Sequence, residues 1–145
     1  MELSKAFHSS SNALFIVVID DSAVVCRILE VLLTKEGHQV QRFQDPVSAI
    51  RALLITGETP LPDLFFIDLS MPTLSGYEVT QCFKKHPASM HIPIIVISRL
   101  DDTVARLKAR LAGAAAYLPK PFEVQDLFTL VRSFAERPNA PSSEK

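Results

Sequence analysis

The stretch Leu64-Phe65-Phe66-Ile67-Asp68 is an unbroken apolar run that ends in an acid, and the rest of the chain is interpreted from it. An earlier run, Leu14–Ile19, is followed by Asp20-Asp21, and a later one, Ala115–Leu118, leads to Lys120-Pro121. Continuous runs of this kind are typical of strands that are buried on both faces. If the strands are parallel, three carboxylates and one ammonium group meet at one edge of a sheet.

Working outward, the apolar runs alternate with segments whose apolar residues recur at helical spacing. We expect strands at 14–19, 39–43, 64–67, 92–97 and 115–118. Ser75-Gly-Tyr-Glu78 is a capping box that opens the third helix. The other helices are predicted from these apolar positions: Val25, Ile28, Leu29 and Leu32; Val47, Ile50 and Leu54; Val104, Leu107 and Leu111; Leu127, Leu130, Val131 and Phe134. Alternation of this kind predicts an α/β fold, a doubly wound parallel sheet of five strands with five helices on its two faces.

The bulk composition fits one domain of a globular protein. The chain has 145 residues, 48% of them apolar and 21% charged, and a formal net charge of −1. This charge provides no field that would attract nucleic acid or an anionic membrane directly. We predict a flexible segment at 1–12, a domain at 13–137 and a disordered tail at 138–145. Cys26 and Cys82 lie among apolar neighbours and are expected to be buried reduced thiols, which suits the cytoplasm.

Four of the five predicted strands end in a chemically distinctive residue: Asp20-Asp21, Asp68, Ser98 and Lys120. Each alone has a plain interpretation as a helix cap, a loop acid or a solvated charge. Ligands of open α/β sheets bind beyond the carboxyl ends of the strands, where all four lie. Two unit charges about 4 Å apart repel by about 4 kcal/mol at an effective dielectric near 20, and a divalent cation relieves that repulsion. Oxygen ligands without His or Cys favour Mg²⁺, and an Asp carboxylate can accept a phosphoryl group.

Five motifs in this order and spacing resemble the receiver domain of bacterial two-component response regulators, in particular its stand-alone, chemotaxis-regulator-like members. They are Ile19-Asp20-Asp21-Ser22, Ile67-Asp68-Leu-Ser-Met71-Pro72, Ser75-Gly-Tyr-Glu78, Val96-Ile97-Ser98 and Tyr117-Leu-Pro-Lys120-Pro121-Phe122. The resemblance covers Leu14 to Glu136. It implies a flavodoxin-like sheet with strand order 2-1-3-4-5.

The resemblance also implies a role for each site residue. Asp68 would accept the phosphoryl group from a phosphohistidine of a sensor histidine kinase or a phosphotransfer protein. Mg²⁺ would be held by Asp20, Asp21, Asp68 and the backbone carbonyl of Ser70. Lys120 would pair with the acceptor or its phosphoryl group, and the Lys120-Pro121 bond would be cis. Ser98 and Tyr117 would form the switch, the hydroxyl of Ser98 binding the phosphoryl group while Tyr117 moves inward.

The output implied by the resemblance is docking through the face of the fourth helix, the fifth strand and the fifth helix. The downstream protein partner is unknown, and a homodimer through the same face is a further expectation. We expect a phosphoacceptor with intrinsic phosphotransfer and self-dephosphorylation, and no enzyme that acts on a separate substrate.

The chain departs from the family pattern beside the hydroxyl position, where Arg99 and Leu100 follow Ser98. Arg99 could narrow access to Asp68, bind the phosphoryl group or point into solvent. Fast-hydrolysing relatives carry acid or amide groups at the positions of Ser70 and Leu100, so slow self-dephosphorylation is expected here.

Two rival functions stay open on the sequence. The first is a pseudo-receiver, the same fold used as a phosphorylation-independent docking module. The second is an Asp-nucleophile phosphatase that acts on small substrates. That class needs a second acid, the general acid, two residues after the nucleophile, and this chain has Ser70 there. Arg106 and Arg110 are interpreted as a solvated helix face. The four histidines lack the spacing of a zinc site.

Overall fold

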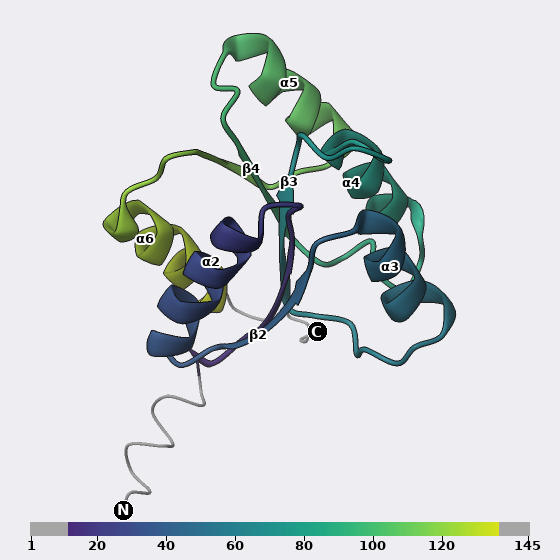
Figure 1. Cartoon of the computed structure of the whole chain (residues 1–145), viewed down its shortest axis with the longest axis horizontal. Coiled ribbons are helices and arrows are strands. Elements are labelled where there is room, and N and C mark those ends of the chain that lie inside the picture. Colours follow the sequence, from purple (N-terminus) through teal and green to yellow (C-terminus); the bar gives the residue numbers. More distant parts are fainter. Residues whose placement is uncertain (1–11, 137–145) are drawn as a thin grey trace, which may run out of the picture.

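The computed structural model describes residues 12–136 (Figure 1). Its elements are β1 (Phe15–Ile19), α2 (Ala23–Lys35), β2 (Gln39–Phe43), α3 (Pro46–Ile50), the π-helical turn η1 (Arg51–Ile55), β3 (Leu64–Asp68), α4 (Gly76–Lys85), β4 (Ile94–Ser98), α5 (Thr103–Ala112), β5 (Ala116–Pro119) and α6 (Val124–Ala135). The five strands are parallel and lie in the order β2-β1-β3-β4-β5. The predicted fold class and strand order are confirmed. The fourth and fifth helices expected from the sequence are α5 and α6.

The predicted flexible ends, 1–12 and 138–145, lie outside the described residues except for Asn12. Within the described part of the chain, no helix is long and apolar enough to cross a membrane.

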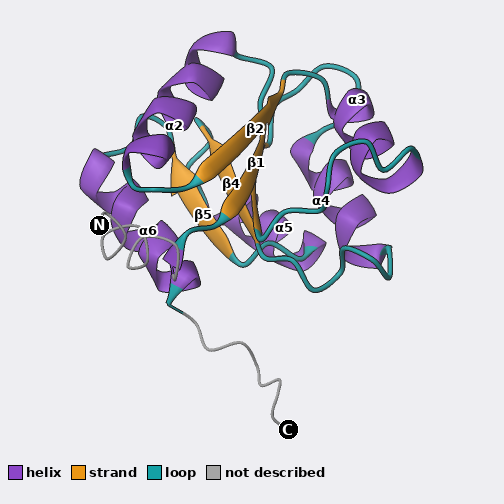
Figure 2. Ribbon diagram, turned by 90° about the horizontal axis from the view of Figure 1, so that it is seen from below, coloured by secondary structure: helices purple, strands orange, loops and turns teal. Residues whose placement is uncertain are grey.

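The sheet separates two apolar layers, as its parallel strands require. Helices α2 and α6 pack on one face through Cys26, Leu29, Leu33, Leu127 and Val131 (Figure 2). Helices α3, α4 and α5 cover the other face. The three central strands β1, β3 and β4 are buried along almost their whole length, which explains why they read as continuous apolar runs.

Capping residues fix the ends of several helices, including the predicted capping box of α4. The Ser75 hydroxyl accepts a hydrogen bond from the Glu78 amide, and the Glu78 carboxylate accepts one from the Ser75 amide, which completes the capping box. Asp45 caps α3, with Pro46 at its first position. Helix α5 ends at Gly113, whose φ of 114° is left-handed and suits glycine.

One helix face was predicted wrongly. In α5 the predicted apolar face, Val104, Leu107 and Leu111, is exposed, while Ala105, Ala109 and Ala112 are buried. The neighbour of a helix decides which stripe is covered, and helical spacing alone does not. Two single positions were also wrong, since Ile28 of α2 and Val47 of α3 are exposed, although the other predicted apolar residues of these helices are buried or packed against the core.

Smaller corrections concern element bounds and one thiol. The third strand includes Asp68, the fourth runs from Ile94 to Ser98, and Pro93 precedes it. The second predicted helix divides into α3 and the π-helical turn η1. Both cysteines are free as expected, but Cys82 is only partly buried, whereas Cys26 is fully buried.

Candidate functional site

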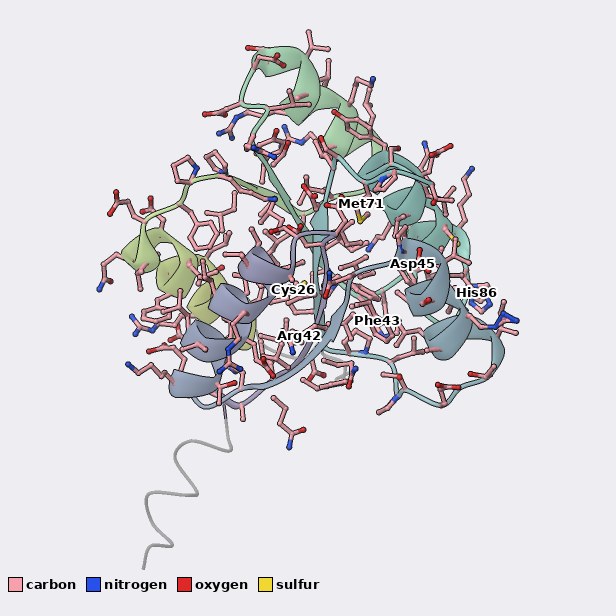
Figure 3. The ribbon with its side chains drawn as sticks, viewed as in Figure 1. Cys26, Arg42, Phe43, Asp45, Met71 and His86 are labelled. Carbon is pink, nitrogen blue, oxygen red and sulfur yellow. The ribbon has the colours of Figure 1, made fainter. Side chains whose placement is uncertain are left out.

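The register of the parallel strands aligns their carboxyl ends. Ile19 of β1 lies opposite Ile67 of β3, and Asp68 lies opposite Ile97 of β4. Ser98 in turn lies opposite Pro119 of β5. The residue that ends each strand or directly follows it, Asp20, Asp68, Ser98 and Lys120, therefore reaches the same edge of the sheet. The loop that leads from β3 to α4 begins beside them and carries Met71 (Figure 3).

Three carboxylates gather at this edge. One oxygen from each of Asp20, Asp21 and Asp68 lies within 4.8 Å of the other two. Asp20 is fully buried and Asp68 is 4% exposed, whereas Asp21 faces solvent. A single carboxylate so placed would be neutral or paired, because burial disfavours charge. Three together form a set of hard oxygen donors that fits a divalent cation.

The Lys120 ammonium group joins the two buried acids. Its Nζ lies 3.0 Å from Oδ2 of Asp20 and 3.3 Å from Oδ1 of Asp68. Oδ1 of Asp20 accepts the Ser22 amide at 2.9 Å, but Oδ2 has no partner with hydrogen-bond geometry among the described residues. That oxygen has the lysine as its counter-charge and retains lone pairs for a cation, so the donor set fits the metal that the resemblance implies.

The backbone around Lys120 holds its side chain toward the acids. The Lys120 amide donates to the Ser98 carbonyl at 2.8 Å, which ties the end of β5 to the end of β4. The Lys120-Pro121 peptide bond is cis, as expected from the resemblance.

Burial raises the pKa of the Asp68 carboxyl to about 6, and the negative charge of Asp20 adds to this effect. The Lys120 cation and the Ser70 amide, which donates to Oδ1 at 3.4 Å, act in the opposite direction. The site therefore holds an acid that is mainly ionised at neutral pH but is destabilised by its surroundings. Ser70 contacts Asp68 through its amide.

Cys26 of α2 contacts the backbone of the site and is labelled in Figure 3. Its Sγ donates to the Asp20 carbonyl at 3.2 Å. Burial, and then the negative charge of Asp20, raise the pKa of this thiol to about 11. The thiol is thus protonated at neutral pH and holds backbone without acting as a nucleophile.

Gly76 is a site residue that sequence reasoning did not identify. A Cβ atom on Gly76 would lie 2.2 Å from the Asp68 carbonyl oxygen and 2.6 Å from the Leu69 Cα atom. Its amide donates to the Leu69 carbonyl at 2.9 Å. The start of α4 therefore lies directly against the backbone of Asp68 and Leu69. The only sign of this contact in the sequence was a glycine at the second position of the capping box, where neither a positive φ nor a turn requires glycine.

The two residues expected to form a switch lie on opposite sides of the β4–α5 loop. The Ser98 side chain is buried, and its Oγ accepts the Leu100 amide at 2.9 Å. The Tyr117 hydroxyl donates to the Leu100 carbonyl. The Arg106 guanidinium lies 4.7 Å from the centre of the Tyr117 ring and pairs with Asp101 at 2.7 Å. Tyr117 is therefore only partly buried and is bound to the loop that Ser98 begins.

Arg99 lines a cavity of about 470 Å³. Lys120 and Ser22 line the cavity together with apolar groups, namely Val25, Ile28, Leu32, Pro121, Phe122 and Val124. No hydrogen bond or ion pair holds Arg99 within the described part of the chain. The cavity therefore combines apolar walls with two cations, and one of these, Lys120, also contacts Asp68.

Comparison with known proteins agrees with this geometry. The family model for the response regulator receiver domain matches residues 16–132. Protein PilG of Pseudomonas aeruginosa is 32% identical over 123 residues, which cover 85% of this chain and 88% of PilG. The response regulator PleD of Caulobacter vibrioides is 35% identical over 118 residues, or 81% of this chain.

The chain spans only a quarter of PleD and about half of the transcriptional regulators that it also matches. Among solved structures, a putative response regulator from Chloroflexus aurantiacus superposes with a TM-score of 0.78 at 29% identity, and the match covers 86% of this chain and 99% of that one.

Proposed function

The chain belongs to the response regulator receiver family, and on that premise we propose that it is a phosphorylation-activated switch in two-component signalling. A sensor histidine kinase or a phosphotransfer protein donates the phosphoryl group, and Asp68 accepts it. The observation that carries the proposal is the buried Asp68 carboxylate with the Lys120 ammonium 3.3 Å away and two further acids within 4.8 Å.

In the transfer, a carboxylate oxygen of Asp68 attacks phosphorus and forms a P–O bond. The P–N bond of the phosphohistidine breaks, and its electron pair stays on the departing imidazole nitrogen. Lys120 neutralises charge on the group in transit. Asp20, Asp21, Asp68 and the Ser70 carbonyl are the residues that would hold Mg²⁺, which would neutralise charge on the phosphoryl oxygens.

The new acyl phosphate carries roughly −1.5 to −2 charges in place of the single charge of the Asp68 carboxylate. That charge attracts the Ser98 hydroxyl, which then releases the Leu100 amide. The Leu100 carbonyl is the acceptor for Tyr117, so a shift of this loop frees Tyr117 to move inward. A change from about 1:99 to 99:1 between two conformations takes about 5.5 kcal/mol of differential stabilisation.

The partner then reads the surface formed by α5, β5 and α6, which corresponds to the fourth helix, fifth strand and fifth helix of the family. Asp126 on α6 and Arg106 and Arg110 on α5 give this surface both signs of charge. A homodimer through this surface is the alternative assembly. We place the protein in the cytoplasm, where its free thiols suit a reducing medium.

The acyl phosphate is expected to be long-lived. Neither Ser70 nor Leu100 carries an acid or amide that would orient an attacking water, and Arg99 lines the cavity that Lys120 also lines. Loss of the phosphoryl group within seconds in a phosphate-release assay would reject this part of the proposal. The protein turns over only its own acyl phosphate and acts on no separate substrate.

Arg99 also supports the second candidate function, the pseudo-receiver. A long cation that lines the same cavity as Lys120 would hinder a donor, and the fold would then dock partners without phosphorylation. Small donors separate the two, because they need less room than a protein does.

The test is mass spectrometry of the intact protein after incubation with acetyl phosphate and Mg²⁺. The wild type is expected to gain the mass of one phosphate, and Asp68→Asn is expected to gain none. Asp21→Asn, which removes the exposed acid alone, should be phosphorylated more slowly. If the wild type gains nothing, or if Asp68→Asn gains the same mass, the pseudo-receiver is the better description.

A further inference from the structure

The cavity of about 470 Å³ that Arg99 and Lys120 line has no occupant in the proposed function. Helix α2 forms one wall of this cavity, and the segment that leads from β5 into α6 forms another. Figure 1 shows α2 and α6 side by side on one face of the sheet. Small-molecule sites in proteins have volumes of about 300–1,000 Å³, so this cavity is large enough for a ligand of its own.

The walls of the cavity are apolar, and the core covers them only in part. Val25, Leu32 and Phe122 are partly buried and pack against the apolar layer under α2 and α6. Ile28 and Val124 line the same cavity and are 44% and 43% exposed. Single exposed apolar groups are common on protein surfaces, whereas a group of them around a concave site is typical of a ligand pocket.

The charge that lines the cavity is positive. Its charged residues are Arg99 and Lys120, and no acid of the described chain lines it. The Lys120 ammonium group is already offset, since it lies 3.0 Å from Asp20 and 3.3 Å from Asp68. Arg99 is exposed and has no hydrogen bond or ion pair within residues 12–136. Its guanidinium therefore keeps its donors for an outside anion, and the planar fork of these donors matches a carboxylate.

We propose that this cavity binds a small amphiphilic carboxylate, with the carboxylate on Arg99 and an aliphatic body between α2 and residues 121–124. One cation without a counter-charge matches one negative charge. A dianionic phosphate group would need Lys120 as well, and it would then be repelled by Asp20 and Asp68. The inference goes beyond the proposed function, because it adds a ligand whose binding requires no phosphoryl transfer.

Two other occupants match the cavity less well. An uncharged apolar ligand would make no use of Arg99. An anionic membrane attracts clusters of cations, whereas this cavity offers one cation without a counter-charge and the whole chain has a net charge of −1.

The experiment titrates octanoate into the isotope-labelled full chain and follows the backbone amides by NMR. The amides of Arg99, Phe122 and Val124 are expected to shift together and to saturate as one site. Hexanoate should bind more weakly and decanoate more tightly, by about two- to fourfold for each methylene group. A titration without saturable shifts, or with shifts that leave this cavity out, overturns the proposal.

Matched variants test the two ends of the ligand. Arg99→Gln and Ile28→Ser are each expected to weaken octanoate binding about tenfold. Arg51→Gln and Ile55→Ser remove exposed side chains of the same kinds from η1, on the other side of the sheet, and should leave binding unchanged. Equal binding by Arg99→Gln, or an equal loss with Arg51→Gln, overturns the proposal. Circular dichroism melts confirm that each variant is folded.

Three further measurements make the rival occupants visible. Octanol, which lacks the charge, should bind about tenfold more weakly than octanoate, and equal binding would reduce the site to an apolar recess. Octyl phosphate should also bind more weakly, and tighter binding would assign the cavity to phosphate esters. Co-sedimentation with phosphatidylglycerol vesicles that is lost on Arg99→Gln would assign it to a membrane surface. Each of these three results replaces the proposal.

The Asp68→Asn variant separates this proposal from the proposed function. Asp68 contacts Lys120 but does not line the cavity. The variant should therefore bind octanoate at least as tightly as the wild type, although it accepts no phosphoryl group. Failure of phosphorylation and failure of ligand binding can thus be told apart, and a loss of octanoate binding in Asp68→Asn would overturn the placement of the carboxylate on Arg99.

Discussion

Charged side chains are usually exposed and large apolar ones buried. The carboxyl edge of the sheet departs from the first part of this rule, and the outer face of α5 departs from the second. At the edge, two carboxylates and an ammonium group are held out of water. On α5, leucines are held in water while alanines are inside. Most residues of a folded domain follow the rule, so the exceptions are where function is to be sought.

The two regions also differ in how they act. The buried charges act through electrostatics that water would weaken, so they need fixed distances such as the 3.3 Å between Lys120 and Asp68. The exposed leucines of α5 act through apolar area, which needs exposure and little geometric precision. Substitutions at the edge should therefore change stability and chemistry together. Substitutions of these leucines should change partner binding alone.

The largest effect is expected from Gly76→Ala, because the new Cβ would lie 2.2 Å from the Asp68 carbonyl oxygen and the backbone of Asp68 must move. We expect a loss of about 3 kcal/mol in the free energy of unfolding, with slow phosphorylation. Urea unfolding measures the first and intact mass the second. Gly57→Ala is the control, since nothing lies within 4 Å of its new Cβ and only its φ of 70° is unfavourable. Equal losses in the two variants would remove Gly76 from the site.

Asp68→Asn is expected to raise the free energy of unfolding at pH 7.5 by on the order of 2 kcal/mol, because it removes a buried charge whose pKa is raised to about 6. The folded state holds this proton more tightly than the unfolded state does. The contribution of Asp68 to wild-type stability therefore improves as the pH falls from 7 toward 4, and it worsens as the pH rises through 6.

Urea midpoints from pH 4.5 to 7.5 test the sign of that effect. The difference between Asp68→Asn and the wild type should shrink toward acid pH. Asp126→Asn, at an exposed acid of α6, should give no such gain. A variant less stable than the wild type at pH 7.5 would show that the buried charges of the edge are fully compensated.

The exposed and the buried side of α5 can be compared on one helix. Ala109→Val adds two methyl groups at a position that is 2% exposed and should lower the free energy of unfolding by about 1–3 kcal/mol. Leu111→Gln, on the exposed side, should change it by no more than about 0.5 kcal/mol. If Leu111→Gln proves the more damaging, the Leu111 side chain contributes to the core.

Metal binding should follow the ionisation of Asp68. With a pKa of about 6, most Asp68 carboxyls are protonated at pH 5, so Mg²⁺ affinity should be about tenfold lower there than at pH 7. Thermal melts with and without Mg²⁺ at both values give the shift, and EDTA should remove it. A shift that is the same at pH 5 and pH 7 would mean that Asp68 is not a ligand.

The smallest effect on stability is expected at an exposed ion pair that belongs to neither the carboxyl edge nor α5. Arg132 of α6 and Glu36 at the end of α2 form an exposed pair at 3.1 Å. Arg132→Gln should lower the free energy of unfolding by roughly 0.2–1 kcal/mol, less in high salt. Urea unfolding at two salt concentrations measures this loss, which sets the scale against which the other variants are judged. A loss as large as that of Gly76→Ala would mean that this exposed ion pair matters as much to stability as the close contact at Gly76.

The strands and several helix starts were predictable because each depends on a pattern of residues close together in the sequence. Strands buried on both faces are continuous apolar runs. Ser75 and Asp45 mark the starts of their helices, because their side chains accept hydrogen bonds from backbone amides of the first turn. The face of α5 was not predictable in this way. Alanine and leucine both fit a helical period, and which of the two is covered depends on how closely α4 approaches.

The sequence by itself determined that Asp20, Asp68 and Lys120 lie at the ends of buried strands. A continuous apolar run, and its alternation with segments of helical spacing, can be recognised from residues that are neighbours in the sequence. Only the tertiary structure decided that the lysine lies 3.0 and 3.3 Å from the two acids, and that Gly76 leaves room for the Asp68 backbone. These distances join residues up to 100 positions apart, through strand register and helix packing. No local pattern records them, since register is set by contacts among all five strands at once.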